Sequence, residues 1–355
     1  MSNLKHITID CRMYGKDFGG IGRYVQEIVQ NLIHQNQFYL SILANDEAYE
    51  ELKGRTVENL RIISCSSKMF SIDEQLELYN KIPECDVFWS PYMNVPFLPI
   101  KAKKRIVTIH DVFHVANPEY YSFIKRRLIS LYYFFSTKLS SKIITVSNFS
   151  KKEIGKIFGK DIESKTKVVY NGCDIDSEVV SPKKMQSDYI LFVGSVKPHK
   201  NLKKALLAFE LLDDENLKFV IIGKKEGFIT GDSNVFDIVE KINSGSQKII
   251  FTGSITDEDL YSYYKGARML IMPSLYEGFG LPIIEAMKFN IPISCSNIEV
   301  FHEVGGDQLF YFDPNCEEDI KLSIEKALRN DTINYHNEIL SWKDVSENIK
   351  NILLN

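Results

Sequence analysis

The stretch that most constrains the fold is residues 269–287. It begins with four consecutive apolar residues at 269–272, a run short and dense enough for a strand buried on both faces. A loop containing Gly278 and Gly280 follows, and Pro282 stands where the first turn of a helix should begin. The pattern therefore predicts a strand, a glycine-bearing loop and a helix, the repeating unit of a parallel α/β sheet.

The start of that helix is suited to binding an anion. Backbone N–H groups converge at a helix N-terminus, and the helix dipole favours negative charge there. Glu277 in the loop and Glu285 inside the helix add two carboxylates on either side of the glycines. Because carboxylates accept hydrogen bonds from hydroxyl groups, the segment predicts a ligand that carries both phosphates and sugar hydroxyls. Taken alone, the same residues also fit an ordinary strand–loop–helix connection.

Length and composition describe a globular protein with two domains. The chain has 355 residues, of which 44% are hydrophobic and 25% charged. Its net charge of −4 gives no reason to expect a nucleic-acid partner. The six cysteines are scattered without a Cys-x-x-Cys pair, so we expect reduced core thiols. No apolar run reaches the ~20 residues of a membrane span. Because a strand is expected at 6–11, we predict no signal peptide and a cytoplasmic protein.

The N-terminal half alternates apolar runs with helical patterns. Strands are expected at 6–11, 38–43, 60–64, 87–89, 105–109, 142–146 and 167–170, and helices at 23–33, 72–82, 119–141 and 148–158. Gly20 and Gly22 fall in the loop after the first strand, where glycine permits close backbone approach to a phosphate or sugar. This loop lacks the third glycine of a dinucleotide-binding fingerprint.

His110 and Asp111 directly follow the apolar run at 105–109. Ligands of open α/β sheets bind at the carboxyl ends of the strands, so a ligand site is expected here. The spacing between His110 and His114 also suggests a metal site, but no helix is indicated and no third ligand is near. We therefore expect no metal. The alternative for His110 is a ring merely satisfied by its own loop.

The C-terminal half restarts the alternation after a linker expected at 174–188, which is polar and lacks periodicity. Strands are expected at 189–193, 217–222, 248–251, 267–272, 291–294 and 310–312, and helices at 202–212, 317–328 and 342–353. Gly194, Lys197 and Lys200 lie in the loop before the first of these helices, residues 194–201, which we call the lysine loop. Lysines at a helix N-terminus are unfavourable unless an anion lies between them, which predicts a diphosphate site. Lysines on a solvated loop are the alternative.

Together these segments resemble retaining glycosyltransferase family 4 over nearly the whole chain. The resemblance rests on Glu277 and Glu285 with seven residues between them, a Gly-Gly-x-x-Arg-type loop at 19–23, the His110–Asp111 pair, and Lys200. It implies the α/β GT-B fold, in which two doubly wound Rossmann-like domains face each other across a cleft. The N-terminal domain, 1–175, would bind the acceptor and the C-terminal domain, 188–338, the nucleotide sugar. A helix in 339–355 would return to the N-terminal domain.

The resemblance also implies roles for single residues. The catalytic candidates are His110 and Glu277, both on the donor sugar, and Lys200 on the diphosphate. Glu285 would hold the ribose. The other donor-binding candidates lie in glycine-rich loops, the lysine loop and the helix start: Gly20, Gly22, Gly194, Lys197, Thr252, Gly253, Gly278, Phe279, Gly280 and Leu281. Lysine and amide dipoles would neutralise the diphosphate, so neither a metal nor another cofactor is expected. Ser195 departs from the family, since many members have an arginine there.

The implied reaction moves a hexose from a nucleoside-diphosphate sugar to a glycan or a polyprenyl-diphosphate-linked glycan, with retention. Likeness to bacterial mannosyl- and rhamnosyltransferases of lipopolysaccharide and O-antigen biosynthesis favours GDP-mannose. A glycosidase pair fits less well, because a nucleoside diphosphate already leaves as a stabilised anion. A GT-B epimerase or phosphorylase and a non-catalytic nucleotide-sugar-binding protein stay open. A nicotinamide oxidoreductase is disfavoured by the incomplete fingerprint.

The aromatic and basic helix expected at 119–141 suggests contact with an anionic membrane. Five residues share one face by spacing and are expected to pack inward: Ile124, Leu128, Leu131, Phe135 and Leu139. Arg126, Arg127 and Tyr133 would then face outward, and basic groups beside aromatic rings suit the headgroup region. They are the candidates for membrane or acceptor contact at the inner face of the cell membrane. A solvated face with a subunit contact is the alternative.

Overall fold

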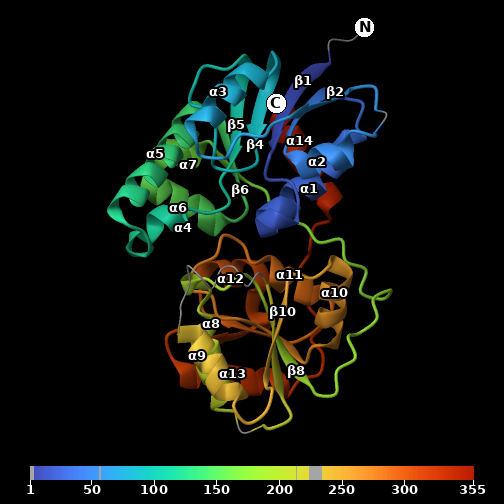
Figure 1. Ribbon diagram of the computed structural model, residues 1–355, viewed down its shortest axis with the longest axis vertical. Coiled ribbons are helices and arrows are strands. Elements are labelled where there is room, and N and C mark those ends of the chain that lie inside the picture. Colours follow the sequence, from blue (N-terminus) through green and yellow to red (C-terminus); the bar gives the residue numbers. More distant parts are fainter. Residues whose placement is uncertain (1–3, 56, 213, 224–233) are drawn as a thin grey trace. The chain divides into compact units, whose positions relative to one another are not determined.

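The computed structural model describes residues 4–55, 57–212, 214–223 and 234–355, and it divides into two compact units (Figure 1). Unit 1 consists of Met1–Gly172 and Leu340–Asn355, and unit 2 of Cys173–Ile339. Each unit is a parallel sheet covered by helices on both faces. The expected class, two Rossmann-like α/β domains, is confirmed.

The sheet of unit 1 has seven parallel strands in the order β3-β2-β1-β4-β5-β6-β7. Helices cover both faces, so the strands are near-continuous apolar runs such as Phe38–Ala44, and all seven were expected from the sequence. Their bounds are β1 (Lys5–Cys11), β2 (Phe38–Ala44), β3 (Leu60–Ser64), β4 (Cys85–Ser90), β5 (Ala102–Thr108), β6 (Lys142–Thr145) and β7 (Thr166–Val168).

The helices of unit 1 lie in two layers (Figure 1). One face carries α1 (Gly19–Ile33), α2 (Asp46–Leu52) and α14 (Trp342–Leu354), and the other carries α3 (Ile72–Lys81), α4 (Phe113–Ala116), α5 (Phe123–Leu139), α6 (Asn148–Phe158) and α7 (Lys160–Ser164). Two short 3-10 helices, η1 (Lys16–Phe18) and η2 (Pro118–Tyr120), precede α1 and α5. The C-terminal α14 packs on α1 through the fully buried Trp342, whose ring lies edge-on to Tyr24 at 6.2 Å.

The sheet of unit 2 has six parallel strands in the order β10-β9-β8-β11-β12-β13. They are β8 (Tyr189–Val193), β9 (Lys218–Ile222), β10 (Ile249–Gly253), β11 (Met269–Met272), β12 (Ile293–Ser296) and β13 (Phe310–Phe312). The helices are α8 (Leu202–Glu210), α9 (Asn234–Asn243), α10 (Asp257–Gly266), α11 (Leu281–Lys288), α12 (Glu299–Gly305) and α13 (Glu317–Leu328), with 3-10 helices η3 (Pro198–Lys200) and η5 (Gly306–Gln308). A single apolar core unites β8, β9, α8 and α13.

Strand order fixes where each unit can bind a ligand. In unit 1 the order reverses between β1 and β4, and in unit 2 between β8 and β11. Loops that leave such a pair of strands diverge to opposite faces and open a crevice at the carboxyl edge. The glycines at the start of α1 follow β1. The lysine loop follows β8, and the Glu277 loop follows β11. These three groups of candidates therefore follow strands of the topological switch points, whereas His110 follows β5 and Thr252 and Gly253 end β10.

Two helices differ from the sequence prediction. α1 begins at Gly19, four residues before the expected Arg23, so Gly20 and Gly22 lie in its first turn and not in a loop. The expected helix at 119–141 is the short η2 followed by α5.

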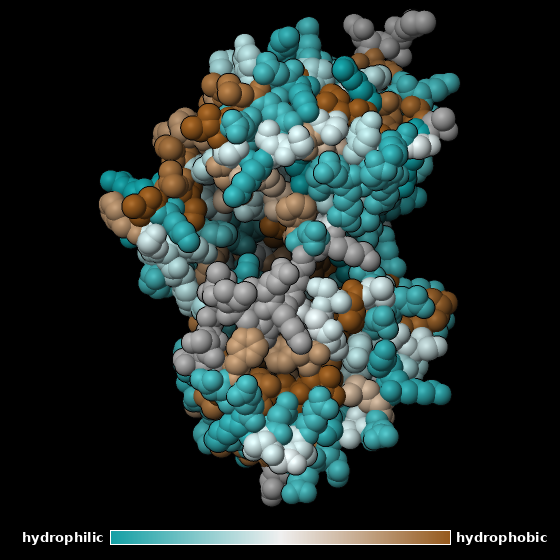
Figure 2. Space-filling view, viewed as in Figure 1, coloured by the Kyte–Doolittle hydropathy of each residue, from teal (hydrophilic) through white to brown (hydrophobic). Residues whose placement is uncertain are grey.

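The predicted inner face of α5 is wrong, and so is the outward placement of Tyr133, whereas Arg126 and Arg127 are exposed as expected. Ile124, Leu128 and Leu131, expected inside, are 71%, 55% and 46% exposed, while Tyr133, expected outside, is 2% exposed. Figure 2 shows the resulting hydrophobic surface over α3 and α5.

Three further observations bear on the predictions. Within the described residues, no helix is both long and apolar enough to cross a membrane. No group of three or more His, Cys, Asp or Glu side chains in that part of the chain could hold a metal ion. The six cysteines, all in described residues, form no disulfide, and five of them are buried.

Candidate active site

The loop after β11 holds the carboxylate of Glu277 between two side chains. Glu277 Oε1 accepts a hydrogen bond from Ser274 Oγ at 2.8 Å and forms an ion pair with Lys200 Nζ. The Lys200 and Glu277 side chains are 20% and 13% exposed, so the pair is largely enclosed by protein but open at one side. The structure thus brings together two candidates that lie 77 residues apart in the sequence.

The lysine loop is fixed to the Glu277 loop by its backbone. The N–H of Leu275 donates to the carbonyl of His199 at 2.8 Å, directly before Lys200. Asn201 follows in the left-handed conformation, with φ of 54°, and its side-chain amide donates to the carbonyl of Pro314 at 2.8 Å. Asparagine tolerates this backbone conformation better than most residues. The position of the Lys200 ammonium is therefore set by its backbone as well as by Glu277.

The start of α11 offers backbone amides to a ligand. Gly280 is the N-cap of this helix, with φ of +102°, a conformation that favours glycine. A glycine N-cap has no side chain that could accept from the first-turn amides, and no side-chain cap is formed there. Phe279 beside it is buried at 6% exposure. Because the Glu277–Lys200 pair lies in the preceding loop and the loop bonded to it, positive charge and amide dipoles are offered from one edge of the sheet.

Glu285 lies one turn inside α11 and is buried, with 4% exposure. Its Oε2 accepts a hydrogen bond from the hydroxyl of Tyr264 on α10 at 2.8 Å. The Tyr264 ring in turn stacks on Phe289 at 5.8 Å, which fixes its orientation. Glu285 is thus a buried, oriented carboxylate, in contrast to the more open Glu277. The predicted contact between Glu285 and a ribose stays a prediction.

The remaining candidates of unit 2 lie along the same carboxyl edge. Thr252 and Gly253 end β10, and the carbonyl of Gly253 accepts from the N–H of Gly223 at 3.1 Å. Gly194 directly follows β8, and its N–H donates to the carbonyl of Ile222 at 2.9 Å. A Cβ on Gly223 would lie 2.1 Å from the carbonyl oxygen of Gly194, so only glycine allows these two strand ends to approach so closely.

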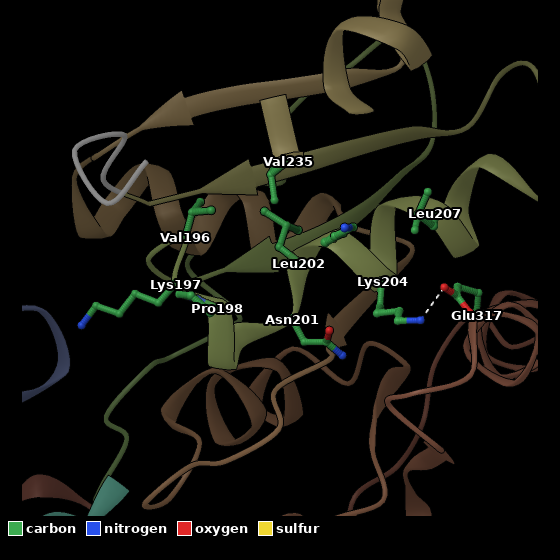
Figure 3. Close-up of a pocket in the computed structure, with 10 residues that line it drawn as sticks. Val196, Lys197, Pro198, Asn201, Leu202, Lys204, Leu207, Val235 and Glu317 are labelled. Carbon is green, nitrogen blue, oxygen red and sulfur yellow. Dashed lines mark hydrogen bonds and ion pairs between the residues drawn. The ribbon is translucent and has the colours of Figure 1, made fainter. Parts of the chain in front are cut away.

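A cavity of about 380 Å³ lies beside the lysine loop and α8 (Figure 3). Its lining residues include Lys197, Lys203 and Lys204, together with apolar groups such as Leu202. In Figure 3, Lys204 points toward Glu317, to which it is bonded at 2.5 Å, while the Lys197 side chain extends away from the others. Neither Lys200 nor Glu277 lines this cavity, so it is separate from the ion pair.

In unit 1, His110 is held as a neutral ring. Its Nε2 lies 2.9 Å from the carbonyl of Pro91, and a carbonyl can only accept, so Nε2 carries the proton and Nδ1 is the acceptor. Tyr24 packs edge-on against the ring at 4.7 Å. Burial lowers the pKa of His110, although the Pro91 hydrogen bond and the charge of Asp111 oppose this. A metal site with His114 has no third ligand among the described residues, although the short α4 that carries His114 was not expected.

The glycines at the start of α1 have different surroundings. A Cβ on Gly22 would lie 1.9 Å from the carbonyl oxygen of Gly15, so a side chain cannot fit without moving the backbone. Gly20, two residues before Gly22, is exposed. Gly22 is therefore required by the local packing, whereas contact between Gly20 and a ligand stays a prediction.

Of the proposed membrane or acceptor contacts, two lie where they were expected. Arg126 and Arg127 are exposed on α5, and the Arg127 guanidinium lies over the Phe123 ring at 5.5 Å. Tyr133 is instead buried, and its hydroxyl donates to the carbonyl of Asp111 at 3.0 Å. Tyr133 is thus a structural residue that fixes the His110–Asp111 loop, and its assignment to the outer face is wrong.

Sequence reasoning missed Ser274 and Tyr264, which orient the two glutamates, and a buried ionic network in unit 1. In that network, Arg12 contacts both Asp10 carboxylate oxygens, at 2.8 and 2.6 Å, and Glu74 Oε1 at 2.5 Å. Arg12 and Glu74 are 3% and 0% exposed. Asp10 and Arg12 are an acid and a base at the carboxyl end of a buried strand, a pattern from which the network could have been predicted.

Two protein families match the chain, one in each half. The model described as Glycosyltransferase Family 4 matches residues 18–177, and that described as Glycosyl transferases group 1 matches residues 175–341. The first covers most of unit 1, including α1 and His110. The second covers nearly all of unit 2, with the lysine loop and α11.

Two bacterial relatives and one solved structure are similar to the chain. It is 31% identical to O-antigen chain mannosyltransferase B of Escherichia coli over 70% of this chain and 65% of that one. It is 31% identical to O-antigen chain mannosyltransferase RfbU of Salmonella typhimurium over 64% and 61%. The chain thus spans less than two thirds of either relative. Anabaena HepE, solved in complex with UDP and glucose, superposes with a TM-score of 0.72 over 99% of both chains at 14% identity, which shows a shared fold.

Proposed function

Because the chain belongs to the group 1 and family 4 glycosyltransferases, we propose that it transfers a hexose from a nucleoside-diphosphate sugar to a glycan, with retention at the anomeric carbon. The observation that carries the proposal is the Lys200–Glu277 pair beside the uncapped start of α11. This edge of unit 2 offers a cation and amide dipoles to a diphosphate, and a carboxylate to sugar hydroxyls.

The chemistry follows from the charge that develops on the leaving group. The bond between the anomeric carbon and the phosphate oxygen breaks, a bond from that carbon to the acceptor hydroxyl oxygen forms, and the hydroxyl proton passes to the departing diphosphate. Lys200 and the α11 amides stabilise the departing nucleoside diphosphate. Glu277, oriented by Ser274 and Lys200, holds the transferred sugar by its hydroxyls. In this proposal a divalent metal is not needed, since its usual charge-neutralising role is filled by these groups.

GDP-mannose is the donor and a glycan of surface polysaccharide synthesis is the acceptor. Support for mannose comes from the two relatives, which are named as O-antigen chain mannosyltransferases. In the same proposal the acceptor glycan is linked to a polyprenyl diphosphate, so the protein works on the cytoplasmic face of the cell membrane. In unit 1, the acceptor nitrogen of His110 is available for a sugar hydroxyl.

The test is a donor panel with defined stereochemistry. Purified protein is incubated with a glycan acceptor and GDP-mannose, UDP-glucose or a deoxyhexose donor, and the product linkage is read by NMR. We expect turnover with GDP-mannose at least about tenfold above the others, a difference of ~1.4 kcal/mol in transition-state binding. We also expect an α-linkage from an α-donor. A β-linkage refutes retention, and preference for another donor refutes mannose. Binding without turnover indicates a non-catalytic nucleotide-sugar-binding protein.

A further inference from the structure

Two neighbouring helices of unit 1, α3 and α5, have large apolar residues on their exposed faces and polar residues among their buried ones. A helix on the surface of a soluble domain normally does the reverse. Of the seventeen exposed large apolar and aromatic residues in the described part of the chain, eleven lie on these two helices or in the short stretches that lead into them. Such a concentration marks an interaction surface, whereas exposed apolar residues scattered singly do not.

On α3, the buried side chains include a charge and an amide. Glu74 is fully buried in the Arg12 network, and the Gln75 side chain accepts from the N–H of Phe97 at 2.7 Å. Ile72, by contrast, is 81% exposed, and Leu76 and Tyr79 at helical spacing are 51% and 50% exposed. The Glu74 carboxylate and the Gln75 side-chain carbonyl accept hydrogen bonds from the rest of unit 1, which fixes the inner face of the helix and leaves Ile72, Leu76 and Tyr79 on its outer face.

α5 repeats this arrangement. Ser136 and Thr137 are buried, and their hydroxyls donate to the helix carbonyls of Tyr132 and Phe134 at 2.7 and 3.0 Å. Phe123 and Ile124 are 72% and 71% exposed at the start of the helix, with Leu128, Leu131 and Phe134 continuing the exposed face.

The apolar faces of the two helices form one surface. No helix is described in the β4–β5 connection, residues 91–101, so α3 and α5 are neighbours in their layer (Figure 1). The Phe70 ring before α3 contacts Tyr132 of α5 at 5.0 Å between centroids, and Phe97 bridges to Phe135 at 4.6 Å. We name this the α3/α5 surface, defined by the exposed residues Phe70, Ile72, Leu76, Phe123, Ile124 and Leu128. Figure 2 shows the hydrophobic residues gathered over these helices.

Charge identifies the medium that this surface meets. The sequence of α5 contains Lys125, Arg126, Arg127 and Lys138, all exposed, and no aspartate or glutamate. An apolar face bordered by cations matches the interface of a bilayer, where apolar groups enter the acyl boundary and cations meet anionic headgroups. We propose that the α3/α5 surface docks unit 1 onto a membrane rich in anionic phospholipid. The inference rests on the proposed function in one respect, since a lipid-linked acceptor is what the docking would serve.

A second copy of the chain fits the surface less well. A two-fold contact places the same patch of both copies face to face, where the four exposed cations of each α5 outnumber Asp73, the exposed carboxylate of α3. Like charges brought together in this way oppose association. Against an anionic bilayer the α5 cations meet negatively charged headgroups, so this repulsion does not arise.

The experiment is co-sedimentation of the full chain with vesicles of phosphatidylglycerol and phosphatidylcholine. The apolar variant is F123S/I124S/L128S, and its matched control V179S/L211S/L322S removes three exposed apolar residues of unit 2. The charge variant is R126E/R127E, and its control K184E/K326E reverses two exposed lysines of unit 2. We expect each test variant to lower vesicle partitioning at least about tenfold, since apolar burial and cation attraction both contribute to interfacial binding. Both controls should partition like the wild type.

The outcomes separate this inference from the proposed function. If the wild type fails to sediment with anionic vesicles at low salt, or binds neutral vesicles equally well, the docking surface is wrong. If it instead forms a dimer that F123S/I124S/L128S dissociates, a second copy is the occupant and the lipid assignment is overturned. Donor turnover is measured in parallel with a water-soluble glycan acceptor. Loss of vesicle binding with normal soluble turnover supports the docking role. Normal vesicle binding without any turnover contradicts the proposed function alone.

Discussion

Replacing Lys200 by methionine is the sharpest test of the diphosphate site. The substitution keeps a long, unbranched apolar side chain in a position that is 20% exposed, so the aliphatic contacts of the lysine stem are largely retained. It removes only the ammonium that pairs with Glu277. Glu277 keeps its hydrogen bond from Ser274 at 2.8 Å, so the carboxylate is not left without a partner.

The expected size of the effect follows from the interaction lost. A hydrogen bond to a charged group contributes about 1.5–3 kcal/mol. Lys200→Met should therefore weaken GDP binding by about 10- to 150-fold. The free energy of unfolding should fall by only about 1 kcal/mol, because the lost ion pair is partly open to solvent and the backbone bonds of both loops remain.

Calorimetric titration of GDP measures this, with Lys204→Met as the matched control. Lys204 lies four residues further on, on α8, and pairs with Glu317, both side chains being 33% exposed. Its loss removes a more exposed ion pair that involves no residue of the Glu277 loop, so GDP affinity should change less than about threefold, or ~0.6 kcal/mol. If the two variants weaken GDP binding equally, the effect is one of overall charge and the assignment of Lys200 is refuted.

Three further predictions concern the glutamates, the metal and the histidine. Glu277→Gln should cut turnover by about 10²-fold, as for loss of one group that stabilises a transition state, and leave GDP affinity nearly unchanged. Glu285→Gln should weaken both, and equal effects on GDP affinity would contradict the division of roles. Turnover should persist in excess EDTA, and loss restored by a divalent ion would overturn the metal-free mechanism. Burial lowers the pKa of His110 below its ordinary 6.5, so the unfolded state binds the proton more readily. Stability should accordingly decline as pH falls below about 6.5, and His110→Gln should flatten that decline in urea titrations.

The sheets could be predicted because buried parallel strands have a distinctive sequence. With both faces covered, β11 is four apolar residues without alternation, and β8 is nearly so. The glycine and proline that end such a run mark the turn to the next helix, which placed the Glu277 loop correctly between β11 and α11. Short sequence patterns were enough to predict this segment, because its conformation depends on one strand and the loop that follows it.

Contacts between distant elements could not be predicted in the same way. Tyr264 on α10 orients Glu285 on α11, yet nothing in its own segment distinguishes it from other tyrosines. Even Ser274, three residues before Glu277 in the same loop, cannot be told by local rules from other serines. The start of α1 was placed too late because glycine is a poor helix former. Its first turn is held by a close approach between Gly22 and the carbonyl of Gly15, which permits no side chain. At the start of α1, contact with the preceding segment therefore overrides the low helix propensity of glycine.

α5 shows why a hydropathy pattern alone misleads about which face of a helix is buried. The rule that apolar residues pack inward assumes that water lies outside. Ser136 and Thr137 can be buried at small cost, because their own helix carbonyls satisfy their hydroxyls. These small side chains let the helix pack closely on unit 1, while bulky Phe123, Ile124 and Leu128 turn outward. The same hydropathy pattern therefore fits a helix whose apolar face packs on a protein core and a helix whose apolar face meets lipid. The position of Ser136 and Thr137 identifies the buried face of α5, and the apolar face opposite is the one for which we propose contact with a membrane.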